Sequence, residues 1–188
     1  MLHSSQPLSA ITEELALWLR GASRIVIMGI GNPLRRDDFV GMAVIKQLAP
    51  AALPNVRLIE TGEVPENYLD AVVRVRPSHV LLIDAGEFEA PPGSVRLVSP
   101  TKVAGLSLST HALPLSLVSE YLEKRTKATI ALLTIQPKVL DFGEGLSEEL
   151  SRVVKEVSEA IRRAEALSGK RRVRSLRPSR RAGKRSVR

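Results

Sequence analysis

The residues with the clearest chemical potential in this 188-residue chain are three aspartates and a histidine. Asp37 and Asp38 close the glycine-containing segment G-I-G-N-P-L-R-R-D-D, directly after an apolar run. Asp84 follows another apolar run, and His111 ends the connection L-S-L-S-T-H. Two carboxylates and one imidazole suit a borderline divalent ion such as zinc or nickel. Asp38, Asp84 and His111 are therefore candidates for one metal site with positions open to water or substrate.

Each of these residues is also compatible with a structural role. Asp37 or Asp38 can cap the helix that follows them. Asp84 can order a turn at the glycine that comes two residues later, and His111 can be a helix-terminal residue with a hydrogen-bonded ring. The spacing alone does not decide between these roles and a metal site.

Several other kinds of site are disfavoured or absent. A dinucleotide-binding turn needs G-x-G-x-x-G, but Leu34 stands at the third glycine position, and two carboxylates there oppose a phosphate. Neither G-x-S-x-G nor H-E-x-x-H occurs. The chain has no cysteine, which excludes disulfides, thiolate ligands and cysteine nucleophiles. Of the other histidines, His3 is near the terminus, and His79 leads into a predicted buried strand, where we expect a structural role.

The elements that must position these residues can be read from hydrophobic periodicity. Short apolar runs without polar alternation predict strands buried on both faces: Ile25–Ile30, Val56–Ile59, Val80–Ile83, Val95–Val98 and Ile130–Ile135. Helical spacing predicts helices over Leu8–Leu19, Gly41–Leu48, Glu66–Val75, Thr110–Lys124 and Ser147–Ser168. This alternation predicts an α/β fold, a three-layer α/β/α sandwich with a mostly parallel, mixed sheet of about five strands.

Two finer expectations follow from this pattern. Val95–Val98 is bounded by prolines, which indicates an edge or antiparallel strand. In open α/β sheets, ligands bind beyond the carboxyl ends of the strands. Asp38 and Asp84 should therefore meet at that edge, with His111 at the mouth of the same crevice.

The net charge of +8 is confined to one end of the chain. Gly169–Arg188 holds ten of the 28 Lys and Arg residues and no acidic residue, so that the preceding body carries 18 basic and 20 acidic residues. We expect residues 1–168 to form a single α/β domain and residues 169–188 to be a disordered basic tail. The tail can bind polyanions non-specifically, and no specific nucleic-acid partner is expected.

Composition also bears on location and assembly. No apolar run approaches the roughly 20 residues that span a membrane, and no secretory signal is visible at the N-terminus. Together with the lack of cysteine, this predicts a cytoplasmic protein without a membrane partner. We expect a monomer. Asn, Gln, Cys and Met are scarce, a composition that favours a heat-adapted source.

Four segments resemble the motifs of one known family, in order along the chain. G-I-G-N-P-L-R-R-D-D-F-V-G resembles the amino-terminal motif of the hydrogenase maturation endopeptidases. L-L-I-D-A-G-E-F resembles their aspartate motif, and S-T-H-A-L-P-L-S-L resembles their histidine motif. T-I-Q-P-K-V-L-D-F-G-E-G-L-S is similar to the closing pattern of the family. The resemblance covers about Ile25 to Leu150, most of the body.

The resemblance implies an endopeptidase that removes the C-terminal extension from a nickel–iron hydrogenase large-subunit precursor after nickel insertion. It places the three metal-contacting and catalytic positions of the family at Asp38, Asp84 and His111. Asp37 matches the first acidic position of the motif, which is not the metal contact. The implied cofactor is nickel carried by the substrate, or else another divalent metal, and the implied partner is the precursor. The sequence does not choose between a metal that is only recognised and one that polarises the carbonyl or activates a water.

One position departs from the family pattern, and two other functions stay open. Phe39 stands where the family usually has Gly or Ala, so that its ring is expected to narrow the substrate entrance or alter the turn. A non-catalytic, metal-binding chaperone of hydrogenase assembly is the first alternative. The second is a peptidyl-tRNA hydrolase, whose opening motif G-I-G-N-P resembles, although the histidine expected shortly after that motif is missing here.

Overall fold

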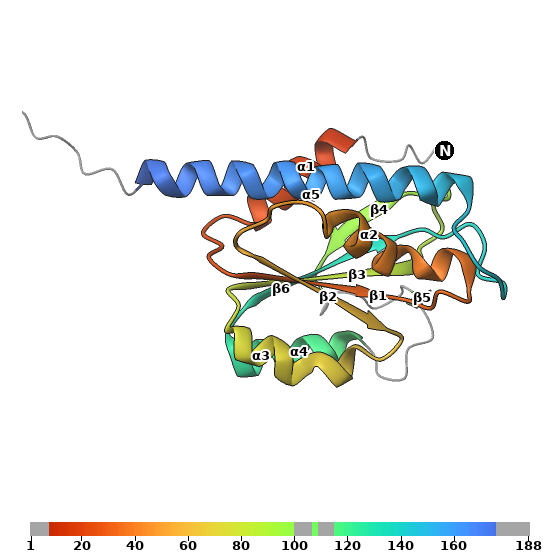
Figure 1. The fold of residues 1–188 in the computed structure, drawn as a ribbon, viewed down its shortest axis with the longest axis horizontal. Coiled ribbons are helices and arrows are strands. Elements are labelled where there is room, and N and C mark those ends of the chain that lie inside the picture. The colour runs from red at the N-terminus through yellow and green to blue at the C-terminus, as the bar shows by residue number, and fades with distance from the viewer. Residues whose placement is uncertain (1–7, 100–106, 109–114, 176–188) are drawn as a thin grey trace, which may run out of the picture.

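The computed structural model describes residues 8–99, 107–108 and 115–175, and Figure 1 shows their arrangement. The helices are α1 (Leu8–Trp18), α2 (Val40–Leu48), α3 (Leu69–Val75), α4 (Leu115–Thr126) and α5 (Glu148–Ser175), with short 3-10 helices η1 (Arg36–Phe39) and η2 (Pro65–Tyr68). The strands are β1 (Ile25–Ile30), β2 (Val56–Gly62), β3 (His79–Glu87), β4 (Val95–Val98), β5 (Ser107–Leu108) and β6 (Thr129–Ile135).

The central sheet has the strand order β2-β1-β3-β6-β4, and the two-residue β5 pairs with the end of β3. β2, β1, β3 and β6 run parallel to one another, and β4 is antiparallel to β6. The expectation for Val95–Val98 is therefore confirmed, because this strand is both an edge strand and antiparallel. The chain leaves β1 to form β2 on one side and then crosses to form β3 on the other side of β1. The carboxyl ends of β1 and β3 thus form the topological switch point, where open α/β sheets bind ligands.

Helices cover both faces of the sheet, which confirms the three-layer α/β/α architecture. In Figure 1, α1, α2 and α5 lie on one side of the strands, while α3 and α4 lie on the other. Alternate residues of each buried strand enter two separate cores, as the period of two requires. In β3, Leu81 and Ile83 pack in the core beneath α2 and α5, and Val80 and Leu82 pack in the core against α3 and α4.

Several strand and helix boundaries differ from the predicted ones. Pairing with neighbouring strands extends two strands, and one helix begins later than predicted. β3 continues four residues past Ile83, because Asp84 and Ala85 pair with β6 and the next two residues pair with β5. β2 continues to Gly62, which pairs with Ile30 across an irregularity in the register. The helix predicted from Glu66 begins as a 3-10 turn and becomes α-helical only at Leu69. For the helix predicted over Thr110–Lys124, the described part begins at Leu115, and residues 110–114 lie outside the described ranges.

The last helix crosses the predicted boundary between domain and tail. α5 begins after Ser147, whose Oγ accepts a hydrogen bond from Leu150 N at 3.4 Å, as expected for an N-cap. The helix then continues to Ser175, so residues 169–175 are helical rather than disordered as predicted. Its end extends beyond the edge of the sheet (Figure 1).

None of the helices in the described ranges is long and apolar enough to cross a membrane.

Candidate active site at the carboxyl edge of the sheet

Two glycines let the first loop and α2 lie directly on the strand ends. A Cβ atom added at Gly41, in the first turn of α2, would collide with the backbone oxygens of Ile30 and Ile83. Gly31, with φ at +137°, has its Cα against the backbone oxygen of Asp38, where a Cβ would also collide. Only glycine accommodates such close approach together with a positive φ. The glycines of the motif therefore bring η1 and α2 against the ends of β1 and β3.

Asp38 reaches the switch point through this packing. It lies in η1, is buried, and its Oδ2 accepts a hydrogen bond from Asn32 N at 2.8 Å. The loop that leaves β1 and the carboxylate of Asp38 thus hold each other in place. Neither Asp37 nor Asp38 caps a helix with its side chain: η1 and α2 have Arg35 and Phe39 at their N-caps, and neither cap makes a side-chain hydrogen bond. The capping alternative is therefore wrong for both residues.

Asp84 lies within β3 and not after it, because the strand runs on to Glu87. Its side chain is fully buried. It follows Ile83, whose carbonyl oxygen contacts α2 at Gly41, and it pairs in register with Thr134 of β6. The idea that Asp84 orders a turn at Ala85–Gly86 is wrong, since those two residues continue the strand. The structure therefore brings two buried carboxylates, Asp38 and Asp84, to the same edge of the sheet, at the switch point.

His111, the third candidate, lies outside the described residues. The described residues on either side of the segment are informative. Leu108 pairs with Gly86, two positions beyond Asp84, and Leu115 is buried in the core cluster shared with Leu82. By alternation along β3, Asp84 points to the same face as Leu82. The chain on both sides of His111 is therefore anchored on the face and near the edge where Asp84 lies.

Asp37 has a role that the sequence did not reveal. It is fully buried, and its carboxylate accepts hydrogen bonds from Lys138 N at 2.9 Å and Val139 N at 3.0 Å. It also accepts two from Ser147, one from the backbone N at 2.7 Å and one from the hydroxyl at 3.0 Å. A further bond joins Asp37 N to Val139 O at 3.1 Å. Asp37 therefore fixes both ends of the segment 138–147, which we call the closing loop.

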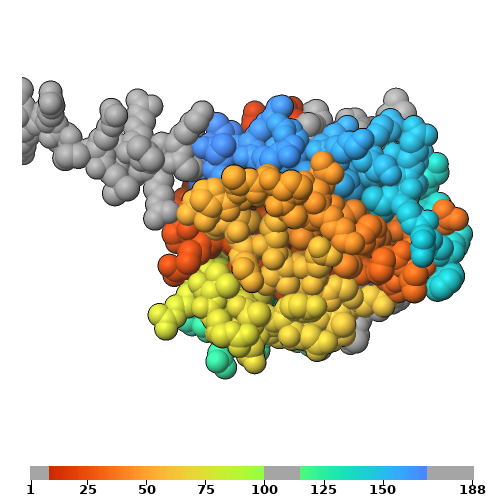
Figure 2. Space-filling model, viewed as in Figure 1, coloured from red at the N-terminus to blue at the C-terminus, as the bar shows by residue number. Residues whose placement is uncertain are grey.

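The tip of the closing loop is also attached to the loop after β1. Gly143 N donates to Leu34 O at 2.8 Å, and Arg36 N donates to Gly143 O at 2.9 Å. Arg36 adopts a positive φ of 44° at this contact. Figure 2 shows the two segments side by side at one end of the molecule, the 30s in orange and the 140s in cyan. The first and last motifs of the sequence thus form one continuous surface.

Phe39, which departs from the family pattern, lies at the N-cap of α2. Its ring stands 5.0 Å from the ammonium of Lys46 on the same helix, and Lys46 is 3.9 Å from the carboxylate of Glu60. The position of the ring is explained by this cation–π contact over α2. The expected effect of Phe39 on the substrate entrance stays a prediction.

His79 lies far from the candidate active site and is packed against an aromatic ring. His79 begins β3 at the opposite edge of the sheet, with its ring edge-on to Trp18 at 5.0 Å between centroids. Burial lowers its pKa, against an opposing hydrogen bond with the Trp18 backbone. In the ranges that the structure covers, no three His, Asp or Glu side chains gather closely enough to hold a metal ion. The metal site predicted from Asp38, Asp84 and His111 therefore stays a prediction.

Comparisons with known proteins agree with this fold. The sequence model of the hydrogenase maturation protease family matches residues 42–164, which is more than half of the chain. That range includes Asp84 and begins four residues after Asp38. A putative hydrogenase maturation protease from Methanocaldococcus jannaschii is 38% identical over 140 residues, covering 70% of this chain and 82% of the relative. The hydrogenase 3 maturation protease of Escherichia coli K12 is 28% identical over 137 residues, covering 72% and 87%.

A solved structure extends the likeness to three dimensions. The crystal structure of a [NiFe] hydrogenase maturation protease from Thermococcus kodakarensis is 32% identical, with a TM-score of 0.75. The superposition covers 83% of this chain and 99% of the other.

Proposed function

Because this chain belongs to the hydrogenase maturation protease family, we propose that it removes the C-terminal extension of a nickel–iron hydrogenase large-subunit precursor after nickel insertion. In this proposal, Asp38, Asp84 and His111 contact the nickel that the precursor already carries. The observation that carries it is the pair of buried carboxylates, Asp38 and Asp84, at the switch point of the sheet. Burying a carboxylate is unfavourable in itself, which makes such a pair typical of a functional site.

The chemistry follows from what these side chains can do. Carboxylate and imidazole donors complete the coordination of a nickel ion held by the precursor, so that only nickel-loaded precursor is bound productively. That contact holds the scissile peptide next to the carboxylates, and positioning of this kind contributes up to roughly 7–11 kcal/mol to catalysis. A carboxylate at this place also accepts a proton from the attacking water, as a general base does. The packing of Gly31 and Gly41 fixes Asp38 for this task.

The test is processing of nickel-loaded and nickel-free precursor, followed as a mobility shift on a gel. We expect cleavage of the nickel-loaded precursor only. Asp38→Asn keeps an oxygen that can accept the hydrogen bond from Asn32 but removes the charge, and His111→Ala removes the imidazole. Both variants should lose processing by about 10²-fold or more, the usual scale for acid–base or positioning groups.

Asp70→Asn is the matched control, because Asp70 is exposed in the first turn of α3. This control should process at the wild-type rate. If Asp38→Asn and His111→Ala also do, the site assignment is wrong. If wild-type protein cleaves neither form of the precursor, the proposed function is wrong.

A further inference from the structure

Exposed apolar side chains gather at the same edge as the candidate active site. Among the described residues, six large apolar side chains are exposed, and three of them belong to loops at the carboxyl edge. They are Leu34 (44% exposed), Val64 (38%) and Phe142 (82%), and we call them the rim cluster. Isolated apolar residues on a surface are ordinary, whereas a group of them beside a site marks an interaction surface.

The backbone brings the three loops of the rim cluster together. Gly31 N donates to Gly62 O at 3.1 Å, which joins the loop of Leu34 to the segment that leads to Val64. Gly143 N donates to Leu34 O, which joins Phe142 to the same loop. Each loop follows a different strand, β1, β2 or β6, and the first of them also carries Asp38. The rim cluster is therefore continuous with the candidate active site.

The loop that carries Phe142 is fixed by hydrogen bonds to other parts of the chain. The closing loop is fixed at both ends by the buried carboxylate of Asp37 and at its tip by the two hydrogen bonds of Gly143. Exposed apolar surface costs about 25 cal/mol per Å² relative to burial, and the Phe142 ring is 82% exposed on this loop. A rigid, solvent-exposed aromatic residue needs little ordering when it is buried by a partner, which is the usual property of an interface anchor.

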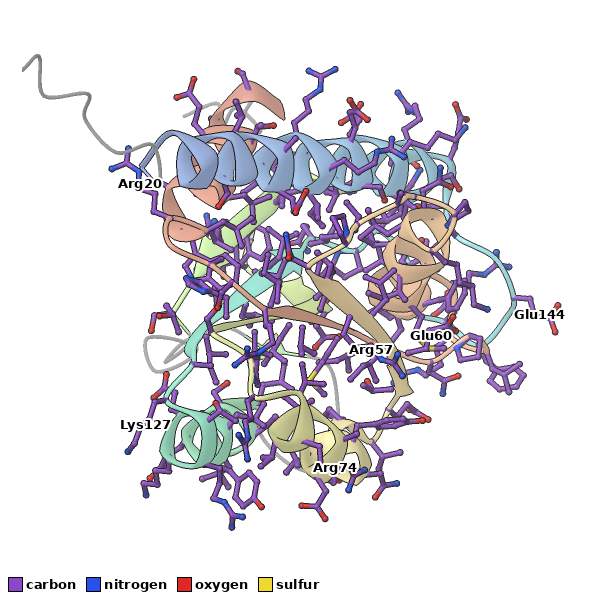
Figure 3. The ribbon with its side chains drawn as sticks, turned by 60° about the vertical axis from the view of Figure 1, so that its left-hand side comes forward. Arg20, Arg57, Glu60, Arg74, Lys127 and Glu144 are labelled. Atoms are coloured by element: carbon purple, nitrogen blue, oxygen red, sulfur yellow. The ribbon has the colours of Figure 1, made fainter. Side chains whose placement is uncertain are left out.

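The loops of the rim cluster carry charges of both signs, with three exposed carboxylates against two exposed cations, Arg36 and Lys138, and the half-buried Arg35. Exposed carboxylates in the same loops are those of Glu63, Asp141 and Glu144. In Figure 3, Glu144 extends into solvent from the closing loop. Arg36 is the exposed cation of these loops that stands apart from an ion pair, since Lys138 is paired with Glu149 at 2.7 Å. A segment that is apolar and flanked by positive charge complements this surface.

We propose that the rim cluster docks a segment of the substrate in which an apolar side chain is flanked by Lys or Arg. This inference rests on the proposed function, because it takes the hydrogenase precursor as the partner. Phe142 and Leu34 contact the apolar side chain, and the carboxylates of Asp141 and Glu144 contact its basic neighbours. Recognition then has two parts, the nickel at the carboxylates and this segment at the rim.

The experiment compares Phe142→Ala and Glu144→Lys with wild type in processing of nickel-loaded precursor and in calorimetric binding to it. Both variants should raise KM and Kd about tenfold while kcat changes less than twofold, because truncating an interface anchor typically weakens binding on this scale. Raising the salt concentration should raise Kd for wild type and less for Glu144→Lys. Thermal unfolding should be unchanged, because both side chains are exposed.

Leu17→Ala and Glu13→Lys are the matched controls, an exposed apolar and an exposed acidic residue on α1, away from these loops (Figure 1). They should leave KM and Kd unchanged. The inference is overturned if Phe142→Ala binds precursor as wild type does, or if wild type does not bind it at all. Failure of the proposed function looks different: wild type then binds precursor with the expected dependence on Phe142 but does not cleave it.

Discussion

At the scale of single residues, two adjacent aspartates have separate hydrogen-bond partners. Asp38 points to the loop that leaves β1 and lies at the switch point, whereas Asp37 holds the closing loop through four hydrogen bonds. Both are buried, so that burial does not distinguish them. The segments that they hold do, because Asp37 accepts hydrogen bonds from the two ends of the closing loop, whereas Asp38 accepts one from the loop after β1.

Substitution should separate the two roles. Asp37→Asn replaces one accepting oxygen by an amide nitrogen and leaves buried N–H groups of the closing loop without an acceptor. We expect a loss of about 2–4 kcal/mol in the free energy of unfolding. Asp38→Asn should lose processing while its free energy of unfolding changes by less than about 1 kcal/mol. Urea denaturation of both variants measures this, and equal stability losses would contradict the separation.

At the scale of elements, the position of α2 depends on the absence of one side chain. Gly41→Ala adds a Cβ that meets the carbonyl oxygens of Ile30 and Ile83, so α2 has to move away from the sheet. The cost of overpacking is about 1–3 kcal/mol, and processing should fall further than stability alone explains, since η1 moves with the helix. Gly21→Ala is the control. It has a φ of +79° but open space, so strain of about 1–2 kcal/mol should leave processing intact.

Thermal unfolding and processing rates of Gly41→Ala and Gly21→Ala test whether the position of α2 determines activity. Equal effects on processing would mean that α2 does not position the site.

The elements themselves were largely predictable, because their patterns are local. The apolar runs and helical stripes identified each strand of the main sheet and the helices on both faces. What sequence reasoning missed depends on distant partners. β3 extends to Glu87 because Ser107 and Leu108 pair with it, and α5 continues beyond Ser168 where no apolar stripe requires it. The role of Asp37 was hidden for the same reason: its partners are 101 to 110 positions away in the sequence.

At the scale of the whole molecule, the two edges of the sheet differ in character. The carboxyl edge carries buried carboxylates and exposed apolar side chains, whereas the amino edge carries His79, packed against Trp18. The assignment of His79 to structure followed from its place before a buried run. Sequence reasoning expected Asp38 and Asp84 at the carboxyl edge, where the structure has them, and their joint metal site with His111 stays a prediction.

The amino edge should make stability depend on pH. Burial lowers the pKa of His79 below its ordinary value of 6.5, with the hydrogen bond to the Trp18 backbone opposing the shift. The unfolded chain therefore binds a proton at pH values where the folded chain does not. This contribution to stability is complete above about pH 6.5 and is lost as the pH falls through the lowered pKa. His79→Phe keeps a ring against Trp18 but cannot titrate.

Denaturation of wild type and His79→Phe between pH 8 and pH 5 measures the difference. Wild type should lose more stability than the variant below about pH 6.5. Parallel curves would show that His79 titrates equally in both states.

The hydrogen bonds by which Asp37 fixes the closing loop have a practical consequence for engineering. Its carboxylate accepts hydrogen bonds from the backbone N–H groups of Lys138, Val139 and Ser147. The hydroxyl of Ser147 is the one side chain of the loop among these four donors. The backbone of the loop is therefore held without the side chains of Asp141 and Phe142, which are exposed. If the rim cluster docks the precursor as proposed, exchange of those positions between proteases of this family should change which precursor is bound while the scaffold keeps its stability.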